Sequence, residues 1–529
     1  MNKKNEINKI SEFLSNTTKH PIINRRDFLS RWGKGIFSAS LCIPEFSFSQ
    51  EETVDLCTSN MDQNLASTLI IDLIGGGHLI GSNFIVSKST DGNQLGDLDY
   101  DARGLGVNDN DGGVGLIKES NINTDLGIAL HANSGILQGI QTILNNSASP
   151  STYYQSVDGA ILCSKTLDDT NNNIINPLQW ICNAGCVGSF GTSIGNKTTK
   201  SGGNSITPVF NSSSKNFPTP LVQESNLIKL LQISRLGNKL STDKQKKLLK
   251  LIEDLNLNSL EQRSDKFSNS LKNRLHCDYK IPMRVLTDPK FSLNNLRIPN
   301  NGFFDQTFNL VGTNSTLKNF ETFKLFGHLL TSKFFGVGTI GLSGFDYHDG
   351  TRLTGDSADK ELGINLGGLI KACVDAGKNL FVVIITDGGV GVDLMNANNI
   401  DADGRINWVA DRGTASAAVL LAINGSGKSR PTMRSHNNGH SIRQIGRVDS
   451  QSILGTSYKV ANIQVDTKTK VLTTNGSVGL VSGIFANYLA LHGIENKLGE
   501  FAGIDVFSTS SGGSSLDEYL VFDHSFYKG

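Results

Sequence analysis

The sequence predicts an α/β protein with a mostly parallel sheet flanked by helices. Two observations lead to this class. Five runs of strand length are apolar almost throughout, at residues 68–74, 159–163, 335–342, 379–386 and 417–423. Strands that are buried on both faces are typical of parallel sheets. Segments with helical spacing of apolar residues separate several of these runs, which indicates helices over both faces of the sheet.

The elements follow in order along the chain. The strand at 68–74 leads into a tight turn of three glycines, and the Asp-, Asn- and Gly-rich residues 91–115 are expected to form a surface loop. Residues 165–218, rich in Asn, Ser, Thr and Gly, are expected to be the least regular part. With the helical pattern at 224–276 they form a low-complexity and helical insertion at about 165–300. Further helices are predicted at 126–144, 359–376 and 476–494.

The first residues resemble an export signal. Arg25 and Arg26 stand before Asp27-Phe28-Leu29, as in a twin-arginine motif, and a weakly apolar stretch follows at 36–48. Small residues at positions 47 and 49 match the spacing that a signal peptidase reads. We therefore expect residues 1–49 to be a signal peptide and residues 50–529 to be one α/β domain. The folded protein would cross the membrane by the twin-arginine translocase and be periplasmic or extracellular.

The composition and charge of the chain limit the classes of binding partner. The formal net charge is +0 and the pI is about 7.1, which argues against nucleic acid as a partner. The apolar stretch at 478–494 contains Ser482, Asn487 and His492. It is short and polar for a membrane span, so we expect a core helix and no stable span in the mature chain.

Six cysteines remain after the expected cleavage, and an even number allows disulfides in an oxidising compartment. Cys182 and Cys186 are the pair closest in sequence, and they could form a local disulfide or remain two thiols. Cys373 lies on a helical pattern and is expected to be buried.

Polar side chains recur at the ends of the predicted strands, where open α/β sheets bind ligands. The candidates are Asp72 and His78, Asp346 and His348, Asp387, and the pair Asp411 and Arg412. Each could be a turn or helix-capping residue alone. Together they could hold a divalent metal, with Zn²⁺, Mg²⁺, Ca²⁺ and Mn²⁺ all open.

Several short motifs resemble one bacterial family. The segment Gly341-Leu-Ser-Gly-Phe-Asp-Tyr-His348 resembles the Gly-Gly-Phe-Asp-Thr-His signature of the family called domain of unknown function 1501. Residues 73–78, 381–391 and 411–415 resemble further segments of that family in the same order. The family is often exported by the twin-arginine route and is similar to the alkaline phosphatase and sulfatase superfamily.

The resemblance implies an alkaline-phosphatase-like fold and a metal-dependent hydrolase of phosphate or sulfate esters, acting on a small anionic ester. It makes Asp346 and His348 the first candidates for metal ligands, followed by Asp387, Asp72 and Asp411. No nucleophile stands out, and Thr170 is the nearest hydroxyl to the expected position.

Arg412 departs from the family, which has a histidine beside the aspartate. A guanidinium cannot ligate a metal because it has no free lone pair. Arg412 would instead bind an anionic substrate or replace the metal's charge. A catalytically degenerate member, acting in periplasmic binding or envelope assembly, therefore stays open. A dinucleotide-binding enzyme is a further alternative, because the glycines at 75, 77 and 81 follow a predicted strand with a variant of the dinucleotide-binding spacing.

Overall fold

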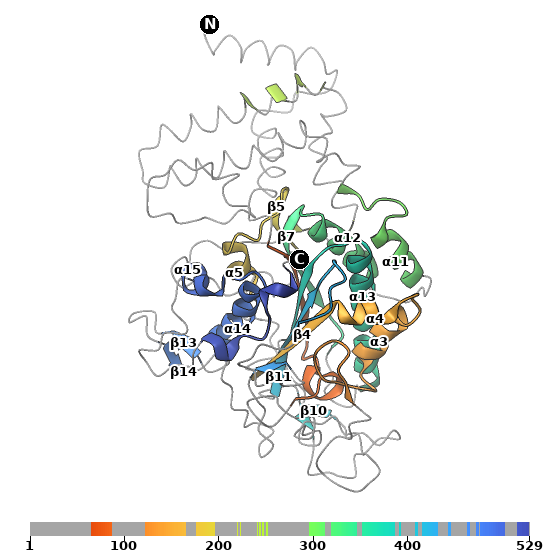
Figure 1. The fold of residues 1–529 in the computed structure, drawn as a ribbon, viewed down its shortest axis with the longest axis vertical. Coiled ribbons are helices and arrows are strands. Elements are labelled where there is room, and N and C mark those ends of the chain that lie inside the picture. Colours follow the sequence, from red (N-terminus) through yellow and green to blue (C-terminus); the bar gives the residue numbers. More distant parts are fainter. Residues whose placement is uncertain are drawn as a thin grey trace, which may run out of the picture.

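The computed structural model describes the chain in pieces. They are residues 65–86, 122–165, 176–195, 296–312, 319–345, 352–386, 415–431, 477–502 and 516–527, with short pieces at 219–220, 223, within 241–251, and at 391–392, 408–410, 443–445, 463–465 and 472–474. Figure 1 shows these pieces around one central sheet with helices on both sides. The predicted α/β class is confirmed.

The central sheet has eight strands in the order β12-β4-β11-β8-β1-β7-β5-β6. The strands are β1 (Ser67–Leu73), β4 (Val157–Lys165), β5 (Gly191–Gly195), β6 (Thr219–Pro220), β7 (Phe335–Leu342), β8 (Leu380–Thr386), β11 (Ala415–Ile423) and β12 (Gln444–Ile445). β1 lies between β7 and β8 and is parallel to both. Only β11 runs against its neighbours in this sheet, β4 and β8. The sheet is therefore mostly parallel, as predicted.

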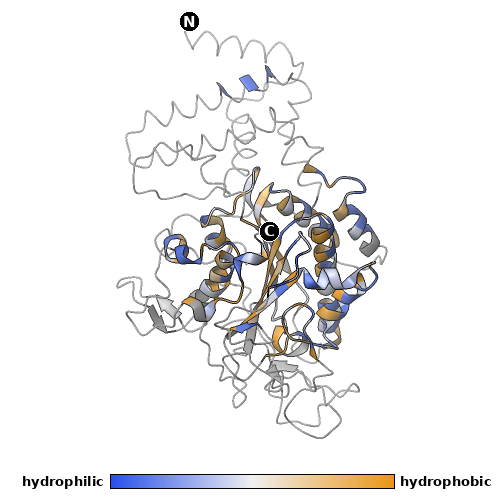
Figure 2. Cartoon of the chain, in the orientation of Figure 1, coloured by the Kyte–Doolittle hydropathy of each residue, from blue (hydrophilic) through white to orange (hydrophobic). Residues whose placement is uncertain are grey.

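The central strands are buried on both faces because their side chains alternate between two cores. In β1, Leu69, Ile71 and Leu73 pack into one core, whereas Ile70 packs into the other. Figure 2 shows these strands as mostly hydrophobic. This two-sided burial explains why an unbroken apolar run marked each of them in the sequence.

Helices cover each face of the sheet, as Figure 1 shows. The first core receives α3 (Gly135–Leu144), α11 (Phe303–Gly312), α12 (Phe320–Thr331) and α13 (Arg352–Asp375). The second receives α5 (Leu178–Asn183), α14 (Ser477–Ala490) and α15 (Leu498–Ala502). No helix in the described parts of the chain combines the length and apolarity that a membrane crossing needs.

The stretch at 165–218 is described only at residue 165 and residues 176–195. Its described part contains the helix α5 and the strand β5, which pairs with β7 in the main sheet. Burial supports these two elements despite the polar composition of the stretch: Trp180 is fully buried and Ile194 packs into the first core. Most of 224–276 and all of 91–115 lie outside the described residues.

Two helix boundaries also differ from the prediction. α3 begins at Gly135 rather than 126, because Leu130–His131 form the strand β3, which pairs with β2 (Ile122–Asn123). α13 begins at Arg352 rather than 359. The helix predicted at 476–494 corresponds to α14, and the 3-10 turn Glu495–Lys497 follows it.

The described cysteines carry no disulfide. Cys182 and Cys186 are buried thiols, so the local bond considered above is absent. Cys373 is fully buried, as expected, and burial raises the pKa of its thiol. Cys57 and Cys277 lie outside the described residues.

Candidate functional site

The candidate site lies at the carboxyl edge of the parallel strands. Leu73 at the end of β1 is the register partner of Leu342 at the end of β7 and of Thr386 at the end of β8. The antiparallel β11 begins at this same edge, with Ala415 opposite Lys165 at the end of β4. Five strand ends therefore meet along one edge, where ligands bind in open α/β folds.

Asp72 is the one proposed metal ligand among the described residues. It lies one residue before the end of β1 and is 2% exposed. Its register partners are Gly341 in β7 and Ile385 in β8. The alternation of β1 directs its side chain to the face of Ile70, over the second core. A buried carboxylate stands at the predicted place in the strand.

The other candidates, Thr170, Asp346, His348, Asp387, Asp411 and Arg412, lie outside the described residues. Their sequence positions are close to the described strand ends. Asp387 directly follows Thr386, and Asp346 directly follows Phe345, the third residue after β7. Whether the set converges stays a prediction.

The three-glycine turn after β1 is tied to the neighbouring strand. Gly75 and Gly76 have φ values of 101° and 95°, which glycine adopts without strain. The Gly77 N–H donates to Thr386 Oγ1 at 2.8 Å, and the Thr386 hydroxyl donates to the Leu73 carbonyl at 3.1 Å. The exits of β1 and β8 are thus fixed to each other.

The segment after this turn argues against a dinucleotide site. His78 is buried, and Leu79–Asn83 form a five-residue π-helix, η1. A dinucleotide fingerprint places its phosphates at the N-terminus of a long α-helix that follows the glycines. The fold offers no such helix here.

Asn83, at the end of η1, is the centre of a buried polar cluster near this edge. Its amide nitrogen donates to Asp359 Oδ2 at 2.7 Å and to the His78 carbonyl at 3.2 Å. Its amide oxygen accepts from Ser134 Oγ at 2.7 Å and from the Ile136 N–H at 3.1 Å. The Asn83, Ser134 and Asp359 side chains are at most 1% exposed.

Sequence reasoning missed this cluster. Ser134 was detectable, because a serine before an apolar helical run is a standard N-cap, and its Oγ does accept the Leu137 N–H. The sequence pattern predicts Asp359 as the start of a helix and gives no sign of a buried polar contact. Asn83 carried no signal, since its partners are 51 and 276 residues away in sequence.

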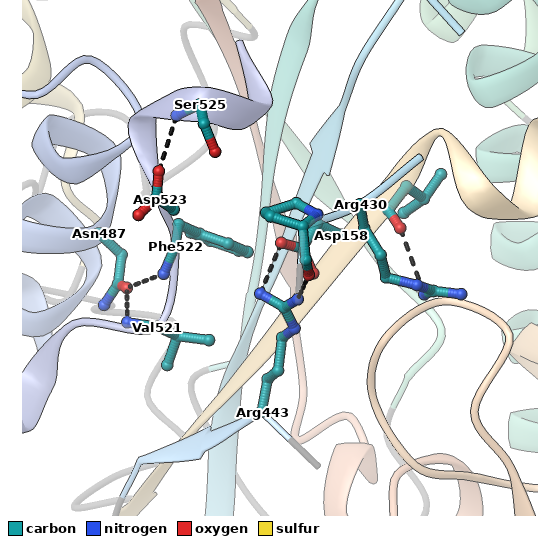
Figure 3. A network of polar contacts seen from close by, with 10 residues as sticks. Asp158, Arg430, Arg443, Asn487, Val521, Phe522, Asp523 and Ser525 are labelled. Carbon is teal, nitrogen blue, oxygen red and sulfur yellow. Dashed lines mark hydrogen bonds and ion pairs between the residues drawn. The ribbon is translucent and has the colours of Figure 1, made fainter. Parts of the chain in front are cut away.

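A second charged cluster lies at the opposite edge (Figure 3). Arg443 donates to Asp158 Oδ2 at 2.7 Å and to the Pro431 carbonyl at 2.6 Å. Arg430 donates to the carbonyls of Asp125 and Val157. Burial raises the pKa of Asp158 to about 7, although both arginines lower it. Because these guanidiniums bond largely to main-chain carbonyls, the cluster closes the start of β4 rather than forming a ligand site.

The donor types of the proposed ligands would suit a divalent cation. Asp72 and the other proposed ligands offer carboxylate oxygens and one imidazole. Zn²⁺ binds both kinds of donor, and Mg²⁺, Ca²⁺ and Mn²⁺ bind carboxylates above all. Within the described residues alone, no three His, Cys, Asp or Glu side chains gather as a metal site requires. Comparisons with models of protein families, with curated proteins and with solved structures find no match for this chain.

Proposed function

We propose that this protein is an exported, metal-dependent hydrolase of phosphate or sulfate esters. One observation carries the proposal: the ends of β1, β7 and β8 are in register at one edge, next to the start of β11. The segments that bear the acidic and histidine motifs leave the sheet from these ends. Asp346 and His348 are the first proposed ligands, with Asp72, Asp387 and Asp411 completing the set.

The proposed chemistry divides between the metal and the chain. A bound divalent cation would neutralise charge on the ester and lower the pKa of the attacking group. The chain's carboxylates and His348 would hold that cation, and Arg412 would bind the anionic ester through its fixed fork of donors. Thr170 is the hydroxyl nearest to the expected nucleophile position and would be the attacking group.

Metal content and hydrolysis test the proposal together. Protein isolated from the periplasm without chelator should contain stoichiometric metal and hydrolyse 4-nitrophenyl phosphate or 4-nitrophenyl sulfate. His348→Ala should abolish both properties. His524→Ala is the matched control, because His524 is an exposed histidine in the C-terminal turn and should leave both unchanged. A metal-free wild-type protein, or a fully active His348→Ala variant, would contradict the proposal.

A degenerate binding or envelope-assembly protein is the second candidate, favoured by Arg412. A permanent positive charge beside Asp411 could replace the cation electrostatically. In that case the wild type would carry no metal and hydrolyse neither ester. Arg412→His would then restore the family's pattern, and gain of metal binding by this variant would support degeneracy.

A further inference from the structure

We infer that residues 516–527 form a strap over the second core that opens as a unit while the sheet stays folded, and that the Asn487 amide holds this strap closed. The inference concerns the edge of the sheet opposite the candidate site and does not rest on the proposed function. It is drawn from hydrogen bonds that join two buried asparagine side chains to the main chain of the strap, some of which Figure 3 shows.

The Asn487 side chain bonds to the strap as a neighbouring strand would. Its amide nitrogen donates to the Tyr519 carbonyl at 2.8 Å. Its amide oxygen accepts from the Val521 N–H at 2.8 Å and from the Phe522 N–H at 3.4 Å. The second amide hydrogen goes to the Gly483 carbonyl, one turn earlier in α14. A carbonyl must face the nitrogen and an N–H must face the oxygen, so these partners fix the orientation of the amide.

Asn487 is an amide in a mostly apolar helix. α14 has the sequence SVGLVSGIFANYLA, and Asn487 is 0% exposed within it. A buried amide costs free energy unless its donors and acceptors are bonded. Three of its four hydrogen bonds go to the strap, so docking of the strap is what satisfies this side chain.

The end of the strap is bonded to the sheet. The Asn424 amide nitrogen donates to the Phe526 carbonyl, and the Tyr527 hydroxyl donates to the Leu380 carbonyl at 2.9 Å. Leu380 is the first residue of β8, and Asn424 directly follows β11, which runs against β8. Both attachments therefore lie at the edge opposite the candidate site, and the strap reaches from α14 to that edge.

Apolar side chains of the strap complete the second core. Those that are at most 3% exposed are Tyr519, Leu520, Val521, Phe522 and Phe526. The Phe522 ring packs edge-on against Phe381 of β8, with ring centroids 6.2 Å apart. Burial of this surface favours the docked strap, and release of the strap would expose part of the second core.

The main-chain ladders of the central strands do not pass through the strap. β8 is joined to β1 by seven register pairs and to β11 by five, and these pairs stay complete when the asparagine bonds to the strap break. The strap also has turns of its own, in which the Phe526 N–H donates to the Asp523 carbonyl at 3.1 Å. Segments with separate sets of contacts open at a lower free energy than the whole fold. We therefore expect the strap to open before β8 does.

Amide hydrogen exchange of the full chain in low urea concentrations tests whether the strap is a unit. Mass spectrometry with fragmentation resolves the single amides. The dependence of opening on urea scales with the surface that opening exposes. Strap amides should therefore show a lower opening free energy and a smaller urea slope than the β8 amides.

Asn487→Ala tests what holds the strap. Loss of a buried hydrogen-bond partner changes an equilibrium constant by about 10- to 100-fold, and we expect exchange at Val521 and Phe522 to accelerate by that factor. The decisive amides are those of Phe526 and Tyr527, which bond to carbonyls inside the strap and not to Asn487. They should accelerate by the same factor. Asn487→Ser replaces the alanine variant if that variant does not fold.

Asn83→Ala is the matched control, because Asn83 is a buried amide whose bonds to Ser134 and Asp359 lie outside the strap. These bonds are lost equally from the closed and the open strap, so strap exchange should match the wild type.

Two results would overturn the inference. Equal opening free energies and urea slopes for the strap and β8 would show that the strap opens only when the whole domain unfolds. An acceleration confined to Val521 and Phe522 in Asn487→Ala would show that the amide shields these two N–H groups without holding the strap. Neither result bears on the hydrolase proposal, which concerns the other edge of the sheet.

Discussion

Burial of the Asp158–Arg443 pair changes the pKa of the Asp158 carboxyl and makes the folding stability depend on pH. Both side chains are almost inaccessible, at 0% and 4% exposed, and the Arg443 guanidinium donates to Asp158 Oδ2 at 2.7 Å. Burial raises the pKa of this carboxyl from 3.8 to about 7. The folded protein therefore holds a proton that the unfolded chain releases. The resulting stabilisation is present below pH 3.8 and is lost as the pH rises through 7.

Asp158→Asn should remove this pH dependence. The amide cannot ionise, so the free energy of unfolding should fall less between pH 4 and 7 than it does in the wild type. The slope is the informative quantity, because leaving Arg443 unpaired costs stability at every pH. Urea unfolding across this range measures it.

Asp305→Asn is the control for that experiment. Its partner Lys324 lies 2.7 Å away and holds the pKa of Asp305 below its usual value. Its contribution is therefore present above the unfolded pKa and lost only on further acidification. Equal slopes for Asp158→Asn and the wild type would show that Asp158 titrates normally.

At the scale of elements, a strand or helix could be predicted from the sequence when the interactions that form it are local. The strand at 335–342 was predicted to the residue, because a run buried on both faces is apolar throughout. The first turns of α13 were missed, because Arg352 to Asp356 have no apolar period and Gly355 disfavours a helix. Tertiary contact supports them instead, since Gly135 of α3 approaches the Asp356 carbonyl.

Adding a methyl group at the α3–α13 contact should force the two helices apart and lower the free energy of unfolding. Gly363→Ala places a Cβ against backbone atoms, so the helices must separate, and overpacking of this kind costs about 1–3 kcal/mol. Gly368→Ala, in the same helix, meets only the Phe308 ring, at 3.0 Å. It should be near neutral, because alanine gains helix propensity. Urea unfolding that ranks the two variants equally would contradict direct backbone packing.

At the scale of the whole molecule, the sequence predicted the sheet but not the contacts that cross it. Local patterns predict strands and turns, and they were sufficient to predict that Asp72 lies near the carboxyl edge of the sheet. The Asn83 to Asp359 bond spans 276 residues and exists only because α13 packs against α3, which also contacts η1. Long-range polar contacts depend on topology, which periodicity within one segment does not carry.

For the whole molecule we also predict export, directed by the first residues rather than by the fold. Arg25→Lys with Arg26→Lys keeps the charge but removes the guanidinium pair of the proposed twin-arginine motif. We expect an uncleaved precursor in the cytoplasm, whereas the wild type should yield a periplasmic protein that begins at Gln50. Lys3→Arg with Lys4→Arg is the control and should be exported normally.

The same fractionation tests why such a route would suit this chain. A site assembled from strand ends hundreds of residues apart exists only in the folded protein. A metal held there would have to be bound after folding, which twin-arginine export permits before the membrane is crossed. If the Arg25→Lys, Arg26→Lys precursor retained in the cytoplasm carries the same metal as the exported wild type, loading precedes export. A metal-free precursor beside a metal-containing periplasmic protein would instead place loading after the crossing.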